Sequence, residues 1–441
     1  MIKMQRLSKI FQPYHVIPKE FQIKQTEKDM YSKSAKLMLE LGIMRQSSPG
    51  CFNLLPLGIR ALEKLIRIVD EGMDSIGGQK VEFPSLINQK LWSTSGRINE
   101  VTELFKLKDR HGQNYILGPT HEEIASDLLS QCQNSYKHFP LMIYQITNKF
   151  RDELRPKLGL IRSKQFTMKD MYSFDIDQES AIKTYETVTE KYDTIFKNLG
   201  VKYHRIRGFS GTMGGTLSHE YHYEAEVGED VLLKCIKCKD ILNSELVQDK
   251  TCPQCGEIGD MDQTKGIEVG HTFLLGDRYT KPFSCNFTDK SGKSKNLQMG
   301  CYGLGITRIL AASIETLSTD EEIRWPRLIA PYSVLIIPPK AKSKEDLIAT
   351  ESLEQLCHSL NQIPELKGEI VVDDRTDMTI GRRNMQGKRF GYPFIIVLGK
   401  RIMEDPALYE LHDINSGVQV DLTLQDLAVY INKHLNDNNV Q

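Results

Sequence analysis

The sequence predicts an α+β protein in which a mainly antiparallel domain is followed by a small α/β domain. Residues 115–316 mix strand-like alternation with helical periods, such as the one over 177–198. Residues 331–441 instead alternate short apolar strands with helices. The charged stretch 318–327 separates the two patterns. With 441 residues, of which 40% are hydrophobic, the chain is long enough to bury the cores of two or three domains.

Composition narrows the classes of function. The net charge is -1, so the chain as a whole does not attract nucleic acid, and any RNA contact must depend on local basic patches. No run of eighteen apolar residues occurs, and we therefore expect no membrane span. Nine cysteines in a chain of this size do not suggest a secreted disulfide scaffold.

Residues 1–11 are basic and contain no acidic side chain. Drawn as a helix, they separate a basic side from an apolar side (Lys3, Arg6 and Lys9 against Met4, Leu7 and Phe11). This pattern is typical of an organelle-targeting segment, to which we assign residues 1–28 together with an N-terminal extension. A disordered basic tail is the alternative, because the segment is short and poor in serine.

Residues 29–75 have mostly helical spacing of apolar side chains. A strand over 80–83, followed by Pro84, is expected next. Helical periodicity alone favours an ordinary buried helix for this region.

Residues 150–174 are the most informative part of the sequence. They predict a hairpin whose first strand carries Arg151 and Glu153 on one face, whose loop holds Arg162, and whose second strand closes the segment. This arrangement suits a nucleotide, because guanidinium forks grip phosphate oxygens and Phe166 offers a stacking face. A solvated hairpin laced with charges is the alternative.

Four of the cysteines form two CxxC pairs with thirteen residues between them, namely Cys235, Cys238, Cys252 and Cys255. Two such turns can bring four thiolates around a tetrahedral zinc ion.

Further along, residues 300–312 place three glycines before a helix that begins near Ile306, with Arg308 in its first turns. Taken alone, that glycine spacing favours a structural turn over a phosphate site.

The C-terminal region supplies a basic cluster. Its strands are expected over 334–337, 369–372 and 393–398, and its helices over 343–361, 379–390 and 423–435. The cluster includes Arg375, Arg382, Arg383 and Lys388. A solvated helix face is the default explanation of such charges.

Several short segments of the sequence resemble the motifs of one protein family. The hairpin is similar to motif 2 of class II aminoacyl-tRNA synthetases, and the glycine run up to Arg308 is similar to motif 3. Together with these motifs, GPTHEE, FRDELRP, MKDMYSF, GTMGGTLSHEYH, EVGHTFLLG and MGCYGLGITR resemble the prolyl-tRNA synthetases, in family order and over nearly the whole chain. The layout resembles the animal mitochondrial type. It implies a class II antiparallel-sheet catalytic domain over 29–325, an anticodon-binding domain over 331–441 and a place in the mitochondrial matrix.

The resemblance implies that proline is attached to tRNA(Pro) with ATP, through a prolyl-adenylate. Arg151 and Arg308 would be catalytic, because the charge that develops at the α-phosphorus calls for fixed cations. The implied ATP site consists of Arg151, Glu153, Arg162, Phe166 and Arg308, and Mg2+ accompanies ATP. The sequence departs from the family's Arg-Glu-Phe at 164–166, where it has Lys-Gln-Phe, so the guanidinium fork is lost there.

Proline recognition requires an acceptor for a secondary ammonium group and a small apolar pocket. The resemblance assigns it to Thr120, Glu122, Arg151, Met168, Asp170, Tyr172 and His271. Thr120 and Glu122 would hold the ammonium group. The alternatives are that Met168 is plain core and that His271 is a structural histidine.

The resemblance also implies partners for the rest of the chain. The basic C-terminal cluster would contact the anticodon region of the tRNA, and the segment that ends at Pro84 resembles motif 1, which builds a homodimer. Bacterial relatives insert an editing domain where this chain has only residues 228–266. The CxxC pairs there are either a zinc staple for a short connection or a vestige with reduced thiols.

Two other functions compete with this one. An accessory protein with the synthetase fold but no catalysis should have lost the phosphate-gripping arginines, which are present here. A class II ligase for another amino acid, such as threonine, would use a metal held by Cys and His within the catalytic sheet. No such ligand set is visible between residues 120 and 172.

Overall fold

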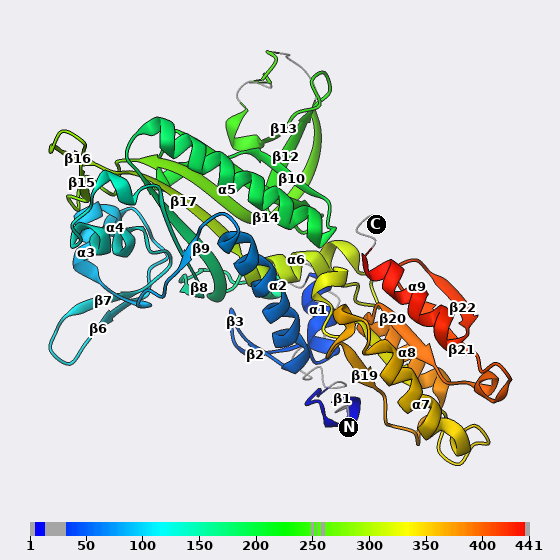
Figure 1. Ribbon diagram of the computed structural model, residues 1–441. Coiled ribbons are helices and arrows are strands. Elements are labelled where there is room, and N and C mark those ends of the chain that lie inside the picture. The colour runs from blue at the N-terminus through cyan, green and yellow to red at the C-terminus, as the bar shows by residue number, and fades with distance from the viewer. Residues whose placement is uncertain (1–4, 14–31, 248–250, 253, 257–260, 437–441) are drawn as a thin grey trace.

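The computed structural model describes most of the chain, which folds into two domains (Figure 1). The described residues are 5–13, 32–247, 251–252, 254–256 and 261–436. A nine-stranded sheet organises the larger domain and a six-stranded sheet the smaller one. None of the described helices is long and apolar enough to cross a lipid bilayer. The arrangement confirms the predicted α+β class.

The large sheet is mainly antiparallel. Its long central strands are β14 (Met261–Gly276), β17 (Gln298–Gly305), β9 (Gln165–Asp175) and β8 (Leu141–Phe150), in that order. The two-residue strand β4 (Gln79–Lys80) pairs in parallel with β8 at one edge. The other side of β14 carries β12 (Asp230–Cys235), β13 (Ile241–Asn243), β10 (Tyr203–Arg207) and β11 (Leu217–Glu224).

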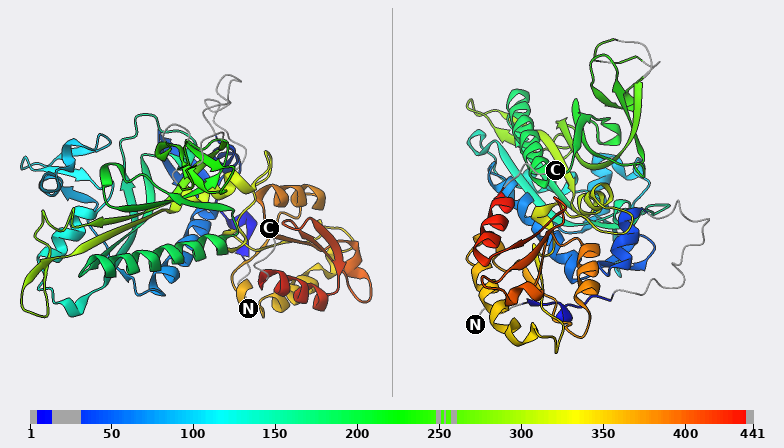
Figure 2. Two further views of the ribbon diagram at one scale, coloured as in Figure 1. Left: turned by 90° about the horizontal axis from the view of Figure 1, so that it is seen from above. Right: turned by 90° about the vertical axis from the view of Figure 1, so that its right-hand side faces the viewer.

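The helices α5 (Gln178–Leu199) and α6 (Ile306–Leu317) pack against this sheet, and α2 (Pro56–Asp74) packs against both of them (Figures 1 and 2). A capping box starts α5, because the Asp177 carboxylate accepts a hydrogen bond from the backbone N–H of Ser180. Gly200 ends the helix with a φ of 70°, which a glycine adopts without strain. These bounds confirm the helix predicted over 177–198 and the one predicted to begin near Ile306.

Alternation along β9 gives the sheet two different faces. Lys169 points toward α5, where its ammonium group contacts the Tyr192 hydroxyl, and burial lowers the pKa of Lys169 to about 7. Met168 and Asp170 point the opposite way and line a cavity. One face of the sheet is therefore covered by helices, and the other is available for a ligand.

A smaller lobe stands beside the cavity. It contains β5 (Leu86–Asn88), α3 (Gln89–Ser95), β6 (Lys106–Lys108), β7 (Asn114–Leu117) and α4 (Glu122–Ser130). The hairpin of β15 (Asn286–Thr288) and β16 (Ser294–Asn296) adjoins the segment after α4, because the Thr288 N–H donates to the Asn134 carbonyl.

Three predicted segments differ from the structure. Residues 29–75 are not continuously helical: α1 (Lys33–Glu40) is followed by a hairpin of β2 (Met44–Ser48) and β3 (Cys51–Leu54) before α2 begins. The strand predicted over 80–83 is reduced to β4. The first arm of the predicted 150–174 hairpin ends at Phe150, so Arg151 and Glu153 lie in the loop just beyond β8.

The smaller domain has the strand order β1-β19-β18-β20-β21-β22. The predicted strands are confirmed as β18 (Val334–Ile337), β19 (Ile370–Val372) and β20 (Phe394–Val397). The predicted helices are confirmed as α7 (Asp346–Leu360), α8 (Ile380–Phe390) and α9 (Leu424–Asn436). The antiparallel strands β21 (Tyr409–Asp413) and β22 (Val418–Leu422) were not predicted.

The described part of the N-terminal segment is not the helix that its amphipathic pattern predicts. β1 (Gln5–Arg6) extends the sheet of the smaller domain by pairing in parallel with β19, and a single 3-10 turn (Leu7–Lys9) follows. Leu7 is buried, and both the backbone N–H and the hydroxyl of Ser8 donate to Asp374. The targeting role of residues 1–28 stays a prediction, because residues 1–4 and 14–28 lie outside the described part of the chain.

Candidate active site

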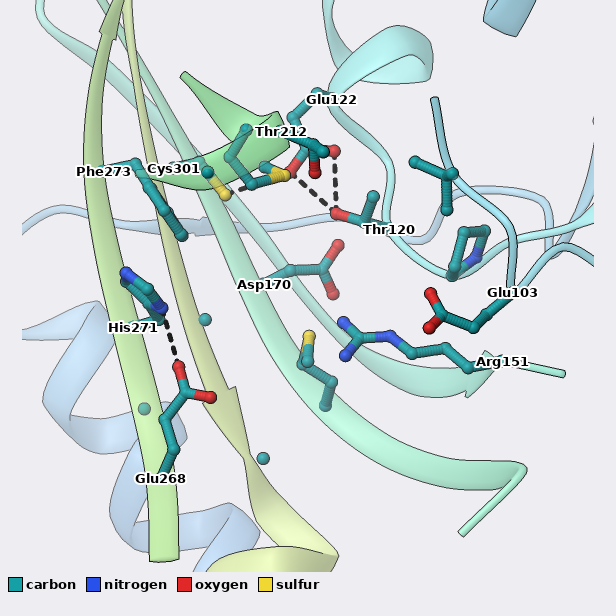
Figure 3. A pocket seen from close by; sticks show the side chains of 18 of the residues that line it. Glu103, Thr120, Glu122, Arg151, Asp170, Thr212, Glu268, His271, Phe273 and Cys301 are labelled. Atoms are coloured by element: carbon teal, nitrogen blue, oxygen red, sulfur yellow. Dashed lines mark hydrogen bonds and ion pairs between the residues drawn. The ribbon is translucent and has the colours of Figure 1, made fainter. Parts of the chain in front are cut away.

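A cavity of about 420 Å³ opens on the face of the large sheet that the helices leave free (Figure 3). Its lining comes from the loop after β8, from β9, β14 and β17, from the start of α4 and from residues 209–213. The structure brings together there most of the residues predicted for ATP and proline, namely Thr120, Glu122, Arg151, Glu153, Phe166, Met168, Asp170, His271 and Arg308. Tyr172 and Arg162 do not line the cavity.

Strand register explains why the floor of the cavity is open. Gly303 of β17 pairs with Asp170 of β9 on one side and with His271 of β14 on the other. Because a glycine has no side chain, this position leaves room between two functional side chains. Alternation along β17 also puts Cys301 and Gly305 on the cavity face.

Arg151 projects into the cavity toward Asp170, as Figure 3 shows. Its backbone N–H donates to the Lys164 carbonyl at 2.9 Å, which holds the start of the loop against the start of β9. Its guanidinium carbon lies 5.1 Å from the centroid of the Phe166 ring. Burial, together with the charge of Arg308, lowers the pKa of Arg151, yet an arginine stays charged at neutral pH.

Asp170 is held by buried partners on three sides. Lys149 Nζ lies 2.6 Å from Oδ1, while the Gln145 amide and the Tyr172 hydroxyl donate to Oδ2 at 2.9 and 2.7 Å. The backbone N–H of His121 donates to the Tyr172 hydroxyl in turn. Tyr172 therefore orients Asp170 from behind the cavity wall and does not face a ligand itself.

Glu122 opens α4 and is fully buried. The Thr120 hydroxyl donates to Oε1 at 2.7 Å, the Cys301 thiol donates to the same oxygen at 3.1 Å, and Arg97 Nη1 donates to Oε2 at 3.1 Å. The sequence analysis missed Cys301 and Arg97. Cys301 lies inside the glycine run, two residues before Gly303, so strand alternation could have placed its side chain on the same face of the sheet. No sequence pattern links Arg97 to the family motifs.

His271 is fixed between two partners. Nε2 lies 2.6 Å from the Ser218 hydroxyl and Nδ1 lies 2.7 Å from a carboxylate oxygen of Glu268, while the ring stacks on Phe273 with centroids 3.9 Å apart. Burial alone would raise the pKa of Glu268, but the hydrogen bond from His271 lowers it to about 2. Glu268 is therefore a carboxylate at neutral pH, and His271 donates to it through Nδ1.

The two remaining predicted arginines differ in their partners. Arg308 donates to the backbone carbonyls of Ile161 and Glu268, so its guanidinium group stays at the cavity wall. Arg162 instead pairs with Glu153 at 2.8 Å and with Glu229 at 2.5 Å. Glu153 and Arg162, both predicted to contact ATP, thus bind each other in this structure.

The four CxxC cysteines converge at the far end of the sheet from the cavity. Their sulfur atoms all lie within 4.8 Å of one another, and the distances between Cys235 and Cys255 and between Cys238 and Cys252 are 3.7 Å. Tetrahedral zinc with Zn–S bonds of about 2.3 Å requires sulfur atoms about 3.8 Å apart. The donor set therefore fits a zinc ion, and none of the four forms a disulfide.

Comparison with known proteins identifies the family. The class II tRNA synthetase core domain (G, H, P, S and T) matches residues 105–317, and the anticodon-binding domain matches residues 333–434. A protein of Rattus norvegicus named as a probable mitochondrial proline–tRNA ligase is 48% identical, over 95% of this chain and 88% of its own length. The human protein of the same name is 46% identical with the same coverage. This chain belongs to the prolyl-tRNA synthetase family. The resemblance read from the motifs is thereby confirmed.

Solved prolyl-tRNA synthetases share the fold at low identity. The Giardia lamblia enzyme, in complex with prolyl-adenylate, matches 90% of this chain and 76% of its own with a TM-score of 0.76 and 18% identity. The Cryptosporidium parvum enzyme, complexed with halofuginone and AMPPNP, matches 92% of this chain and 77% of its own with a TM-score of 0.74 and 17% identity. The catalytic sheet and the smaller domain are thus arranged as in other prolyl-tRNA synthetases.

The basic residues predicted for the anticodon region lie around α8 of this prolyl-tRNA synthetase, but they are not equivalent. Arg382 is exposed and Lys388 is partly exposed. Arg375 pairs with Asp373 at 2.7 Å. Arg383 is fully buried and donates to the backbone carbonyls of Asp373 and Pro338, so in this structure it holds the domain together.

Proposed function

We propose that this protein is the mitochondrial proline–tRNA ligase, which activates proline with ATP and transfers it to tRNA(Pro) in the matrix. The observation that carries the proposal is the cavity in which Thr120 and Glu122 lie on one side of Asp170 and Arg151 lies on the other. An acceptor pair and a fixed cation are what the two ends of a zwitterionic amino acid require. The mitochondrial names of the rat and human relatives support the location.

Proline fits this space with its charges paired. Thr120 and Glu122 accept from the secondary ammonium group, and Arg151 holds the carboxylate. The ring packs against Met168 and the stacked His271 and Phe273. Asp170 keeps its orientation through Lys149, Gln145 and Tyr172 and closes the polar side of the pocket.

Adenylate formation depends on fixed positive charge. The carboxylate of proline attacks the α-phosphorus of ATP, pyrophosphate leaves, and Arg151 stabilises the charge on the phosphate oxygens. Arg308 and Arg162 point toward the β- and γ-phosphates, while Glu153 accepts from the adenine amine and Phe166 stacks on the base. ATP must therefore displace Arg162 from Glu153 and Glu229. Magnesium supplies further charge neutralisation on the phosphates when ATP binds.

Transfer to tRNA requires the smaller domain. Arg375, Arg382 and Lys388 supply positive charge for the anticodon region, where arginines and lysines contact phosphates. The region that resembles motif 1, from α2 to Pro84, would form a homodimer. Zinc at the four cysteines would cross-link β12 to the segment before β14 and so shorten the connection between the halves of the catalytic domain.

Exchange of pyrophosphate into ATP tests the proposed function directly, because it measures adenylate formation without tRNA. Label from pyrophosphate should enter ATP when proline is added and should not do so with threonine. No exchange with proline would contradict the proposal. Exchange with threonine alone would favour the competing ligase.

A further inference from the structure

A buried arginine that belongs to none of the family motifs lies at the end of the cavity where Thr120 and Glu122 would bind the ammonium group of proline. Arg97 begins a 3-10 turn (Arg97–Asn99) after α3, lines the cavity and is only 3% exposed. Its Nη1 atom donates to Glu122 Oε2 and to Glu123 Oε1, each at 3.1 Å. Both carboxylates are fully buried. A single guanidinium group thus bridges the first two residues of α4.

The guanidinium group itself is held in place. It lies over the Trp92 ring, 4.7 Å from the centroid, and 5.5 Å from that of Tyr279. Its Nη2 atom donates to the Met213 sulfur at 3.1 Å. Burial alone would lower the pKa of Arg97, but the charges of Glu122 and Glu123 raise it above its ordinary value. Arg97 is therefore a permanent, oriented cation.

Arg97 completes the set of donors that fixes Glu122. Thr120 and Cys301 donate to Oε1, and Arg97 donates to Oε2, so both carboxylate oxygens are restrained. Because the Thr120 hydroxyl donates its only proton to Glu122, its oxygen can act toward the cavity only as an acceptor. An ammonium group with two N–H donors would meet two oriented acceptors.

The charges of this cluster do not balance without a ligand. Glu122 and Glu123 carry two negative charges against the single positive charge of Arg97. Burial and the charge of Glu122 raise the pKa of Glu123, although Arg97 and the Ser95 hydroxyl, at 2.8 Å, act against the rise. Lys149 does not supply the balancing charge, because it pairs with Asp170 at 2.6 Å. With both carboxylates ionised the cluster lacks one positive charge, and Glu122 and Arg97 of this cluster line the cavity.

We propose that Arg97 is a positioning residue for amino-acid selection: it orients Glu122, and the Arg97–Glu122–Glu123 cluster is completed by the ammonium group of proline. This inference rests on the proposed function, because it takes Glu122 as the ammonium acceptor. Arg97 touches Glu122 and not the reacting atoms, so its loss should affect the binding of proline more than the binding of ATP.

Arg97→Met tests this inference in pyrophosphate exchange with the full-length enzyme. Losing a charged hydrogen bond and leaving two buried carboxylates unmatched should raise KM for proline about tenfold or more. KM for ATP should stay within about twofold, because Arg97 contacts no residue of the predicted phosphate site. Arg60→Met is the matched control: it removes an arginine that pairs with Glu369 at the domain interface, and it should leave both KM values unchanged.

A second substitution separates positioning from mere stability. In the wild-type background, Glu123→Gln removes the unmatched negative charge and should raise KM for proline. Without Arg97, the two buried carboxylates of Glu122 and Glu123 should share a proton, which weakens Glu122 as an acceptor. In the Arg97→Met background, Glu123→Gln removes this sharing and should therefore lower KM for proline. A purely structural role for Arg97 would lower the melting temperature and the fraction of active enzyme without this reversal of sign.

The outcomes distinguish the inference from the proposed function. An unchanged KM for proline in folded Arg97→Met would overturn the role of Arg97, and so would a Glu123→Gln effect of the same sign in both backgrounds. If Arg97→Met does not fold, Arg97→Lys keeps the charge without the fork, and it should give a smaller rise in KM for proline. An unchanged KM in that variant would overturn the inference as well. Absence of proline-dependent exchange in the wild type would instead refute the proposed function.

Discussion

His121 is buried between charged groups and stays neutral. Its ring is fully buried, with Nε2 lying 3.2 Å from the Pro84 carbonyl and Nδ1 lying 3.6 Å from Asp170. Burial, together with the charge of Lys149, lowers the pKa of His121 to about 4. The native protein therefore excludes a proton from this ring at pH values where the unfolded chain would bind one.

Stability should consequently fall as the pH is lowered through the window between 6.5 and about 4. The unfolded chain binds more protons than the native state in this window, so the free energy of unfolding decreases with decreasing pH. Between pH 7 and pH 5, His121 alone should account for a loss of about 2 kcal/mol. Urea unfolding at the two pH values should show a smaller loss for His121→Asn than for the wild type. An identical loss in both proteins would contradict the assignment.

Residues that support a site are harder to predict from sequence than residues that face its ligand. Tyr172 was predicted through the family resemblance alone, and in the structure it lies two residues after Asp170, on the same face of β9. Gln145 and Lys149 come from β8, and they reach Asp170 only because Gln145 is its partner in the β8–β9 register. Register is set by pairing across the sheet, which no short motif encodes.

Backbone partners explain why β8 ends before the predicted strand does. The side chains from Phe150 to Leu154 alternate as a strand requires. The Arg151 N–H still bonds to Lys164 across the hairpin, but the Asp152 N–H bonds to the Glu103 carbonyl outside it, and the Glu153 N–H bonds to the Arg151 carbonyl. The side-chain pattern cannot tell which carbonyl each N–H will find. Because the chain leaves the hydrogen-bond ladder of the sheet after Phe150, the side chains of Arg151 and Glu153 line the cavity.

The four-cysteine element should bind one zinc ion per chain. Sulfur distances of 3.7 Å already match a tetrahedral site, so binding requires little rearrangement, and the binding energy should add to stability. Metal analysis and thermal melting of Cys252→Ser should therefore show a lower zinc content and a lower melting temperature.

Cys132→Ser is the control for this prediction, because Cys132 is exposed and lies outside the cluster. It should change neither zinc content nor melting. Wild-type protein that is free of metal, with melting unaffected by Cys252→Ser, would favour the vestige with reduced thiols.

The order of the two domains could be predicted from the sequence patterns, but the contacts at their interface could not. α2 reaches the smaller domain through Arg60 and Lys64, which both pair with Glu369, and the Trp325 indole donates to the Phe390 carbonyl at 2.8 Å. The contacts of Arg60 and Lys64 join residues about 300 positions apart in the sequence. β1 is a similar case, because a helical wheel cannot indicate that a two-residue strand joins the edge of a distant sheet.

At the scale of the whole molecule, we expect that the enzyme cannot remove its own errors. Alanine is smaller than proline, and one or two missing methylenes give only about 1 to 3 kcal/mol of discrimination. The interval 228–266, where the resemblance places the editing domain of bacterial relatives, contributes β12, β13 and the start of β14 to the large sheet. Pre-formed alanyl-tRNA(Pro) incubated with the purified enzyme should therefore decay at the spontaneous rate. Rapid deacylation that depends on the enzyme would reveal a hydrolytic site.

Proline-dependent pyrophosphate exchange, compared between the wild type and Arg151→Ala, tests the central claim most directly. The claim is that this cavity activates proline, with Arg151 as the cation at the reacting phosphorus. The wild type should exchange label only with proline, and Arg151→Ala should lose about two to three orders of magnitude in rate, because a fixed cation stabilises the transition state. The melting temperature should stay close to that of the wild type. Near-normal exchange by a folded Arg151→Ala protein would contradict the account.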